Sequence, residues 1–186
     1  VYECLNKITT ASKHLLSLIN EVLDMNKIES GAIELQEGKF NLADLIDNMV
    51  TMVLPQINEH SHELQVSVSS LKHEWVVGDS LRIQQAFVNL ISNAVKYTPG
   101  GGSVAITVRP WQFYTRVDIT DTGIGIPEEH YNDVFQRFYR APEVAAQEGV
   151  GLGLYLANGI ITRQKGYISV KSKAGEGTTF SVYLLS

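Results

Sequence analysis

The first thirty residues carry a helical pattern of apolar positions. Between Leu5 and Val22 the apolar residues recur at alternating spacings of three and four, with Ser12 at the one polar position. This spacing is typical of a helix that packs on another helix. A helix of about 25 residues is roughly 37 Å long, so it cannot bury its apolar face alone. We expect it to pack on a partner helix and to end near Gly31, a natural C-terminal cap.

Residues 31–40 are expected to join this helix to a separate domain. A short strand-like stretch at 33–40 leads to Asn41, a candidate N-cap for the amphipathic run 42–57. We therefore predict three segments: a long helix at 1–30, a linker with a short strand at 31–40, and a globular domain at 41–186.

Strand-like and helical patterns are mixed through the rest of the chain. Extended segments are expected at 63–69, 75–77, 103–109, 115–121, 167–172 and 178–184, and helices at 80–97 and 152–164. Pro110 and Trp111 lie in the short connection of one hairpin, and Gly175 and Gly177 mark the turn of another. Because strands and helices do not alternate strictly, we predict an α/β (α+β) two-layer sandwich. Its mixed, mostly antiparallel sheet would be covered on one face by helices.

Composition excludes several classes of function. With 186 residues, 44% of them hydrophobic, the chain can bury one good core. It has no apolar run of about 18 residues and no signal sequence, so we expect a cytoplasmic location without membrane contact. Cys4 is the single cysteine, which excludes an internal disulfide. A net charge of −5 with scattered basic residues argues against nucleic-acid binding.

Two glycine-rich loops, at 121–127 and 149–154, suggest a nucleotide site closed by a lid. The second loop leads into a predicted helix, whose N-terminal amides would suit a phosphate. Asp121 ends an apolar strand just before the first loop, where its carboxylate could accept a hydrogen bond from an exocyclic amine such as that of adenine, or cap a turn. Either loop alone is about as often a plain turn as a ligand site.

Polar residues on the predicted helix 80–97 are a second candidate. Asn89 and Asn93 are four residues apart and share one helix face with Lys96 nearby. They form either a solvated face or a site in which the carboxamide oxygens bind Mg²⁺ and Lys96 meets a phosphate.

Arg140 follows an aromatic cluster and precedes the segment between the two loops. The cluster, which more often belongs to a core than to a ligand site, comprises Phe135, Phe138 and Tyr139. Arg140 is placed to fold back onto a terminal phosphate as a charge clamp. The segment 141–148 carries no helical pattern, so we expect a lid that is mobile without nucleotide.

Taken in order, four motifs resemble those of sensor histidine kinases. Residues 89–98 resemble the N box, 121–127 the first glycine box, 135–140 the F box and 149–154 the second glycine box. The resemblance covers the chain from about residue 40 to its end. The N-terminal helix, which closes with Leu-Asp-Met-Asn-Lys-Ile-Glu-Ser-Gly at 23–31, resembles the second helix of the family's dimerisation and phosphoacceptor hairpin, in a form common among hybrid kinases.

The resemblance implies an ATP-binding catalytic domain, with ATP and Mg²⁺ as cofactors, of the superfamily that includes gyrase, heat-shock chaperone and mismatch-repair ATPases. Asn93 would be the direct Mg²⁺ ligand with Asn89 supporting it, and Asp121 would bind the adenine amine. Lys96 and Tyr97 would contact the phosphates and the ribose or adenine.

The other boxes complete the implied site. The base pocket would be lined by Gly123, Gly125 and Ile126, and the phosphates would meet the backbone amides of Gly149, Gly151, Leu152 and Gly153. Arg140 would reach the γ-phosphate. The implied catalytic residues are Asn89, Lys96 and Arg140.

The implied function is transfer of the γ-phosphoryl group to a histidine in a two-component phosphorelay. In the family this histidine lies on the first hairpin helix and precedes an acidic residue. His14 lies on the predicted N-terminal helix, His60 and His62 fall in a connecting segment, and His73 and His130 lie in turns. We therefore expect the acceptor to lie outside this chain, which would be unable to autophosphorylate alone.

Implied partners are the protein's own phosphoacceptor hairpin, a response-regulator receiver domain and, in the full-length parent, a second copy. The parent can be anchored in the plasma membrane. Two other functions stay open: a nucleotide-sensing interaction module and a hydrolysing ATPase of the same superfamily. Hydrolysing relatives carry a water-activating glutamate where this chain has Asn89, which argues against hydrolysis.

Overall fold

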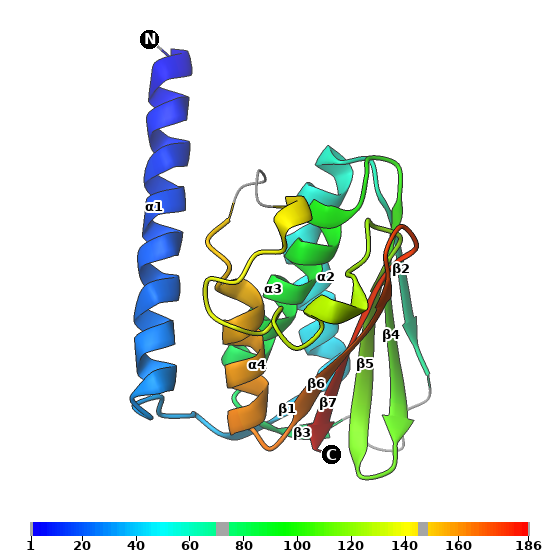
Figure 1. The fold of residues 1–186 in the computed structure, drawn as a ribbon. Coiled ribbons are helices and arrows are strands. Elements are labelled where there is room, and N and C mark those ends of the chain that lie inside the picture. The colour runs from blue at the N-terminus through cyan, green and yellow to red at the C-terminus, as the bar shows by residue number, and fades with distance from the viewer. Residues whose placement is uncertain (1, 70–74, 145–148, 186) are drawn as a thin grey trace.

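The computed structural model describes residues 2–69, 75–144 and 149–185, which form a long helix beside a two-layer domain (Figure 1). The domain contains a five-stranded sheet in the order β2-β4-β5-β7-β6. Its strands are β2 (Glu63–Val68), β4 (Ser103–Trp111), β5 (Tyr114–Asp121), β6 (Tyr167–Lys173) and β7 (Gly177–Leu185). In this sheet β2 and β4 run parallel, and the other neighbouring strands are antiparallel. The predicted mixed, mostly antiparallel sheet is therefore confirmed.

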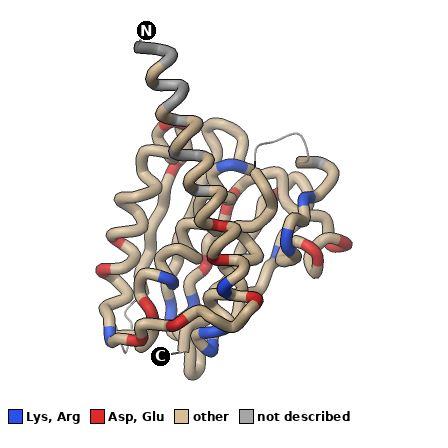
Figure 2. Tube along the Cα trace, turned by 90° about the vertical axis from the view of Figure 1, so that its left-hand side faces the viewer, with Lys and Arg blue, Asp and Glu red and all other residues tan. Residues whose placement is uncertain are grey.

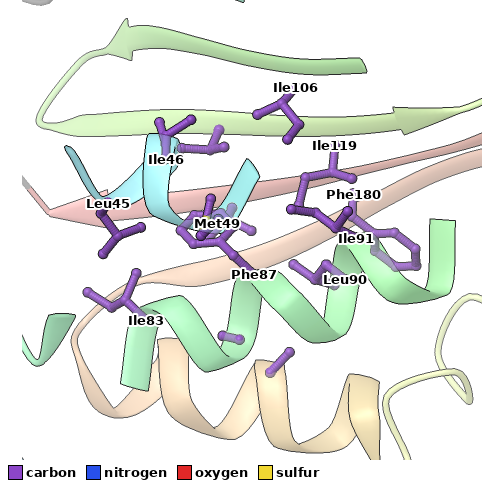
Figure 3. Close-up of a cluster of buried hydrophobic side chains, with 14 of the residues drawn as sticks. Leu45, Ile46, Met49, Ile83, Phe87, Leu90, Ile91, Ile106, Ile119 and Phe180 are labelled. Atoms are coloured by element: carbon purple, nitrogen blue, oxygen red, sulfur yellow. The ribbon is translucent and has the colours of Figure 1, made fainter. Parts of the chain in front are cut away.

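Three helices, α2 (Leu42–Glu59), α3 (Ser80–Tyr97) and α4 (Gly153–Arg163), cover one face of the sheet (Figure 1). Side chains of β4 and β5 such as Ile106 and Ile119 point toward Phe87 and Ile91 of α3, and all four are fully buried (Figure 3). Burial of each such side chain contributes about 1.5–3 kcal/mol. The predicted two-layer arrangement is confirmed, and its core holds α3 in place along one face.

A second, two-stranded sheet joins the linker to the domain. Strand β1 (Gly38–Asn41) pairs antiparallel with β3 (Trp75–Gly78). The strand expected at 33–40 is thus shorter, because only its last residues lie beside a partner strand. Asn41 caps α2 as predicted, since its Oδ1 accepts hydrogen bonds from the amides of Ala43 and Asp44 at 2.8 and 3.4 Å.

The hairpin between β4 and β5 differs from the prediction at its tip. Pro110 and Trp111 continue β4, and the turn consists of Gln112 and Phe113, with Gln112 at a φ of 53°. Strand β2 ends opposite Val108, so the missing N–H of Pro110 removes no bond to β2. Proline is therefore tolerated inside this strand.

Helix α1 (Tyr2–Glu29) is the predicted N-terminal helix, and Gly31 follows it with a φ of 73°. Its last turns pack on the domain, where Met25 is buried against Leu152 and Leu156. Its N-terminal end projects past the domain (Figure 1). The apolar seam exposes Leu5, Leu15, Leu16, Ile19 and Leu23. The C-terminal end of α1 packs against α4, whereas the packing of its exposed seam on a partner helix stays a prediction.

Charged residues of both signs are spread along the described chain. Figure 2 shows Lys and Arg interspersed with Asp and Glu. Among the described residues, no helix combines the length and hydrophobicity that a membrane span needs.

Candidate functional site

A cavity of about 480 Å³ opens between α3, the N-terminus of α4 and the loop that follows β5. Nearly all the residues predicted from the sequence line it, namely Asn89, Asn93, Lys96, Tyr97, Asp121, Gly125, Ile126, Arg140, Gly149, Gly151, Leu152 and Gly153. Gly123, expected to line the base pocket, lies behind its wall. A Cβ on Gly123 would come within 2.6 Å of the carbonyl oxygen of Tyr97, so the loop packs directly on the end of α3.

Asp121 lies at the inner end of the cavity, at the last position of β5. It is only 6% exposed. Its Oδ1 accepts hydrogen bonds from the backbone amides of Gly123 at 2.8 Å and Thr178 at 3.2 Å. Burial raises the pKa of Asp121, and these two amides lower it by a smaller amount. The carboxylate is held in one orientation by two segments far apart in sequence.

Helix α3 presents the polar stripe to the cavity because its opposite face is buried in the core. Its bounds match the prediction, since Asp79 caps its first turn by accepting a bond from the Arg82 amide at 3.1 Å. The Asn89 side-chain amide donates to the carbonyl of Gly153 at 3.3 Å. Lys96 has its Nζ 5.0 Å from the centre of the Tyr97 ring, a cation–π contact. A Cβ on Gly153 would lie 3.8 Å from the Cβ of Asn89 and 3.9 Å from the Nδ2 of Asn93, so both carboxamides lie beside the N-terminus of α4.

The N-terminus of α4 forms the other end of the cavity. This helix begins at Gly153, and no described side chain caps it. Gly149 and Gly151 precede it with φ angles of 131° and 78°, conformations that favour glycine. Uncapped amides at a helix N-terminus are a site for an anion.

The segment between the two glycine loops closes one side of the cavity. Arg140 lines it and donates from Nη2 to the carbonyl of Val144 at 2.6 Å. The lid expected at 141–148 contains a short 3₁₀ turn at Pro142–Val144. Residues 145–148 lie outside the described part of the chain. The amide of Phe138 donates to the carbonyl of Gly151 at 3.0 Å, which joins this segment to the second glycine loop.

The cavity is also lined by residues that were not predicted from the sequence, and two of them are polar residues brought in by the tertiary structure. Thr178 lines the cavity because it pairs with Asp121 across β5 and β7, a register that no local pattern reveals. Glu21 of α1 also lines the cavity, and only the docking of α1 on the domain brings it there.

Helix α1 docks beside the cavity through charged and apolar contacts. Asp24 accepts hydrogen bonds from Arg82 at 3.0 Å and from Gln85 at 2.8 Å, both on α3. Glu29 pairs with Arg137 at 2.6 Å. Together with Met25 against Leu152, these contacts tie α1 to the walls of the site.

Residues 78–186 match the family model described as "Histidine kinase-, DNA gyrase B-, and HSP90-like ATPase". The chain is similar to the signal transduction histidine-protein kinase BarA of Escherichia coli K12, with 35% identity over 182 residues. That match covers 95% of this chain and 20% of BarA. The chain thus spans about a fifth of the length of this curated relative.

Solved structures are similar over nearly the whole chain. Full-length ShkA, crystallised in complex with AMPPNP, matches with a TM-score of 0.82 and 27% identity, over 93% of this chain and 36% of ShkA. The histidine kinase ThkA, in complex with the response regulator TrrA, matches with a TM-score of 0.75 and 25% identity, over 97% of this chain and 49% of that chain. Both matches extend beyond the residues of the family model and into the N-terminal part of the chain.

Proposed function

Since the chain belongs to the family of histidine kinase-, DNA gyrase B- and HSP90-like ATPases, we propose that it binds Mg-ATP in this cavity and transfers the γ-phosphoryl group to a histidine. It carries the ATP-binding catalytic domain found in sensor histidine kinases. The observation that carries the proposal is the polarity of the cavity. A buried carboxylate, Asp121, stands at one end, and the uncapped N-terminus of α4 stands at the other.

At the first end, Asp121 would hold the base. Two amides fix Oδ1, so the carboxylate is already oriented before a ligand arrives. Its acceptor lone pairs suit the exocyclic amine of adenine. Gly125, Ile126 and Tyr97 would form the walls around the base.

At the second end, backbone amides would hold the phosphates. Gly149, Gly151, Leu152 and Gly153 line this part of the cavity. Lys96 supplies a point charge, and Arg140 can turn its guanidinium onto the terminal phosphate. The guanidinium of Arg140 would stabilise the negative charge that builds up on the γ-phosphoryl group during transfer.

Asn93 and Asn89 would hold Mg²⁺, because carboxamide oxygens belong to the ligand class that this hard cation prefers. The described residues contain no cluster of three His, Cys, Asp or Glu side chains that could hold a metal by itself. The ion would therefore share its shell with water and phosphate oxygens, as nucleotide-bound Mg²⁺ does. When bound, it would neutralise charge on the phosphates.

Asn89 favours transfer over hydrolysis. A carboxamide cannot take a proton from water, so this position supplies no general base. Its side-chain amide is instead used to bond Gly153. Without a base to activate water, bound ATP would be protected from hydrolysis until an acceptor nucleophile arrives.

The acceptor would be a histidine on a helix that pairs with α1. His62 precedes Glu63 but is buried, with Nε2 bonded to the carbonyl of Val95 at 3.0 Å, so it cannot reach the cavity. His73 lies outside the described residues. The exposed apolar seam of α1 supports pairing with a hairpin partner and, in the full-length parent, with a second copy. A receiver domain would take the phosphoryl group next, in the cytoplasm, where ATP is available, whether or not the parent is anchored in the plasma membrane.

The decisive experiment is transfer of labelled phosphate from ATP to a phosphoacceptor hairpin added in trans. The expected result is Mg-dependent labelling that disappears when the acceptor histidine is replaced by alanine. Failure to label the hairpin, together with no binding of ATP or ADP by calorimetry, would overturn the proposal.

A nucleotide-sensing interaction module is a second candidate, favoured by the contact of Met25 with Leu152. In that case ATP would control only the docking of α1 or of another domain. Nucleotide binding without transfer to the hairpin would support this candidate, whereas rapid phosphate release by the chain alone would indicate a hydrolysing ATPase.

A further inference from the structure

The tip of the β6–β7 hairpin is built directly onto the first glycine loop. The amide of Gly175 donates to the carbonyl of Ile124 at 2.7 Å. A Cβ on Gly125 would overlap the carbonyl oxygen of Lys173, and one on Gly177 would overlap that of Asp121. The hairpin and the loop are therefore in backbone contact, and the hairpin determines where the wall of the base pocket lies.

The side chain of Ser172, near the end of β6, joins the same two segments. Its Oγ accepts a hydrogen bond from the amide of Ile126 at 2.7 Å. The same oxygen lies 2.8 Å from the carbonyl of Gly177 and 2.8 Å from Oγ1 of Thr178. Ser172 thus bonds the far end of the glycine loop, while Asp121 bonds its near end.

The proton positions in this cluster follow from the number of donors. The carbonyl of Gly177 can only accept, so Ser172 gives it the single hydroxyl proton. The Thr178 hydroxyl must then donate to Ser172, which leaves Thr178 with lone pairs only. Thr178 lines the cavity together with Asp121. Both groups therefore offer acceptors, and no proton, to a ligand.

Tyr131 holds Ser172 in place from the other side. Its hydroxyl accepts from the amide of Ser172 at 2.9 Å and donates to the carbonyl of the same residue. Ser172 lies on β6, the edge strand of the sheet. The Tyr131 hydroxyl therefore bonds the backbone N–H and C=O of Ser172 on the side where β6 has no neighbouring strand. The Ser172 hydroxyl is thus held in position in two ways. The backbone of Ser172 is bonded to Tyr131, and the hydroxyl itself is bonded to Ile126, Gly177 and Thr178.

We propose that Ser172 is a positioning residue for nucleobase specificity: through Thr178 and the glycine loop it makes the base pocket accept an exocyclic amine and reject an exocyclic carbonyl. The inference rests on the proposed binding of ATP. A carbonyl in this place would face the Asp121 carboxylate and the Thr178 lone pairs without a proton between them. Without the Ser172 acceptor, the Thr178 hydroxyl can turn and donate to such a carbonyl.

The test compares the binding of Mg-ATP and Mg-ITP, which differ in this exocyclic group, by calorimetry on the intact chain. The wild type is expected to prefer ATP by about 10- to 100-fold, as for loss of one buried hydrogen bond and exposure of an unpaired acceptor. Ser172→Ala should reduce this preference to about threefold or less, mainly by strengthening ITP, because the freed Thr178 hydroxyl can donate to its exocyclic carbonyl. Ser169→Ala, on the same strand but exposed, is the matched control and should keep the full preference.

A purely structural role would weaken both nucleotides by the same factor and lower the melting temperature, and that outcome would overturn the inference. A wild type that binds both nucleotides equally would overturn it too, while leaving the proposed function intact. Should Ser172→Ala fail to fold, Tyr131→Phe takes its place, because it removes only the hydroxyl that holds Ser172. The ratio of its affinities for Mg-ATP and Mg-ITP should then fall in the same way. A wild type that binds neither nucleotide would overturn the proposed function itself.

Discussion

The side-chain amide of Asn89 donates to the carbonyl of Gly153 at 3.3 Å, which bonds α3 to the first residue of α4. The residue proposed to support Mg²⁺ and the loop proposed to hold the phosphates are therefore connected directly. Replacing Asn89 should therefore also alter the conformation of the loop at the start of α4.

Replacing Asn89 by alanine should weaken Mg-ATP binding by about tenfold, because one hydrogen bond is worth about 0.5–1.5 kcal/mol and a metal-supporting oxygen is lost with it. Calorimetry with Mg²⁺ and with a chelator separates the two contributions. Asn48→Ala, at an exposed position of α2, is the control and should bind as the wild type does. Unchanged affinity of Asn89→Ala in Mg²⁺ would contradict the proposed role.

Replacing Asp121 by asparagine should abolish tight ATP binding without unfolding the domain. An asparagine Oδ1 can still accept from Gly123 and Thr178, but its NH₂ group would then meet the adenine amine donor to donor. We expect a loss of at least about 10-fold in affinity. Circular dichroism checks the fold, and retained affinity would show that Asp121 does not contact the base.

The same substitution should change how stability depends on pH. Burial raises the pKa of Asp121 above its usual 3.8, so the folded chain keeps a proton that the unfolded chain has already lost. The free energy of unfolding therefore falls as pH rises through the range between 3.8 and the raised pKa, and this penalty persists at neutral pH. Asp121→Asn removes it, so its melting temperature at neutral pH should equal or exceed that of the wild type. The difference should shrink as pH falls toward 3.8.

Arg140→Ala should separate ATP from ADP. Its guanidinium is proposed to meet only the γ-phosphate, so affinity for a non-hydrolysable ATP analogue should fall by about 10-fold while ADP binds almost as before. Transfer to the hairpin should be slower still. Arg137→Ala is a suitable control, because Arg137 pairs with Glu29 at the surface and such pairs contribute little. Equal losses for ADP and the analogue would place Arg140 elsewhere on the nucleotide.

Met25→Ala should release α1 from the domain. Met25 is buried against Leu152 and Leu156, and truncating a buried methionine costs about 2–5 kcal/mol. Hydrogen exchange of the last turns of α1 should become faster, while exposed Leu23→Ala should leave it unchanged. Unaltered protection after Met25→Ala would mean that the polar contacts of Asp24 hold α1 without it.

The apolar pattern of residues 80–97 predicted α3 with the bounds that the structure shows, because a helical period is contained within the segment itself. The ordered polar and glycine motifs predicted a nucleotide site for the same reason. Each motif is a short stretch whose backbone needs are local. The roles of the individual site residues and the domain division at residue 40 stay predictions.

The sequence by itself thus determined the main elements, the mostly antiparallel two-layer arrangement and many of the residues that line the cavity. Only the tertiary structure decided that Thr178 lies beside Asp121, that Ser172 bonds the first glycine loop, and that the last turns of α1 dock beside the N-terminus of α4. These three relationships depend on strand register and on packing between segments distant in sequence. The spacing of apolar residues within a segment does not indicate which distant segment it will contact.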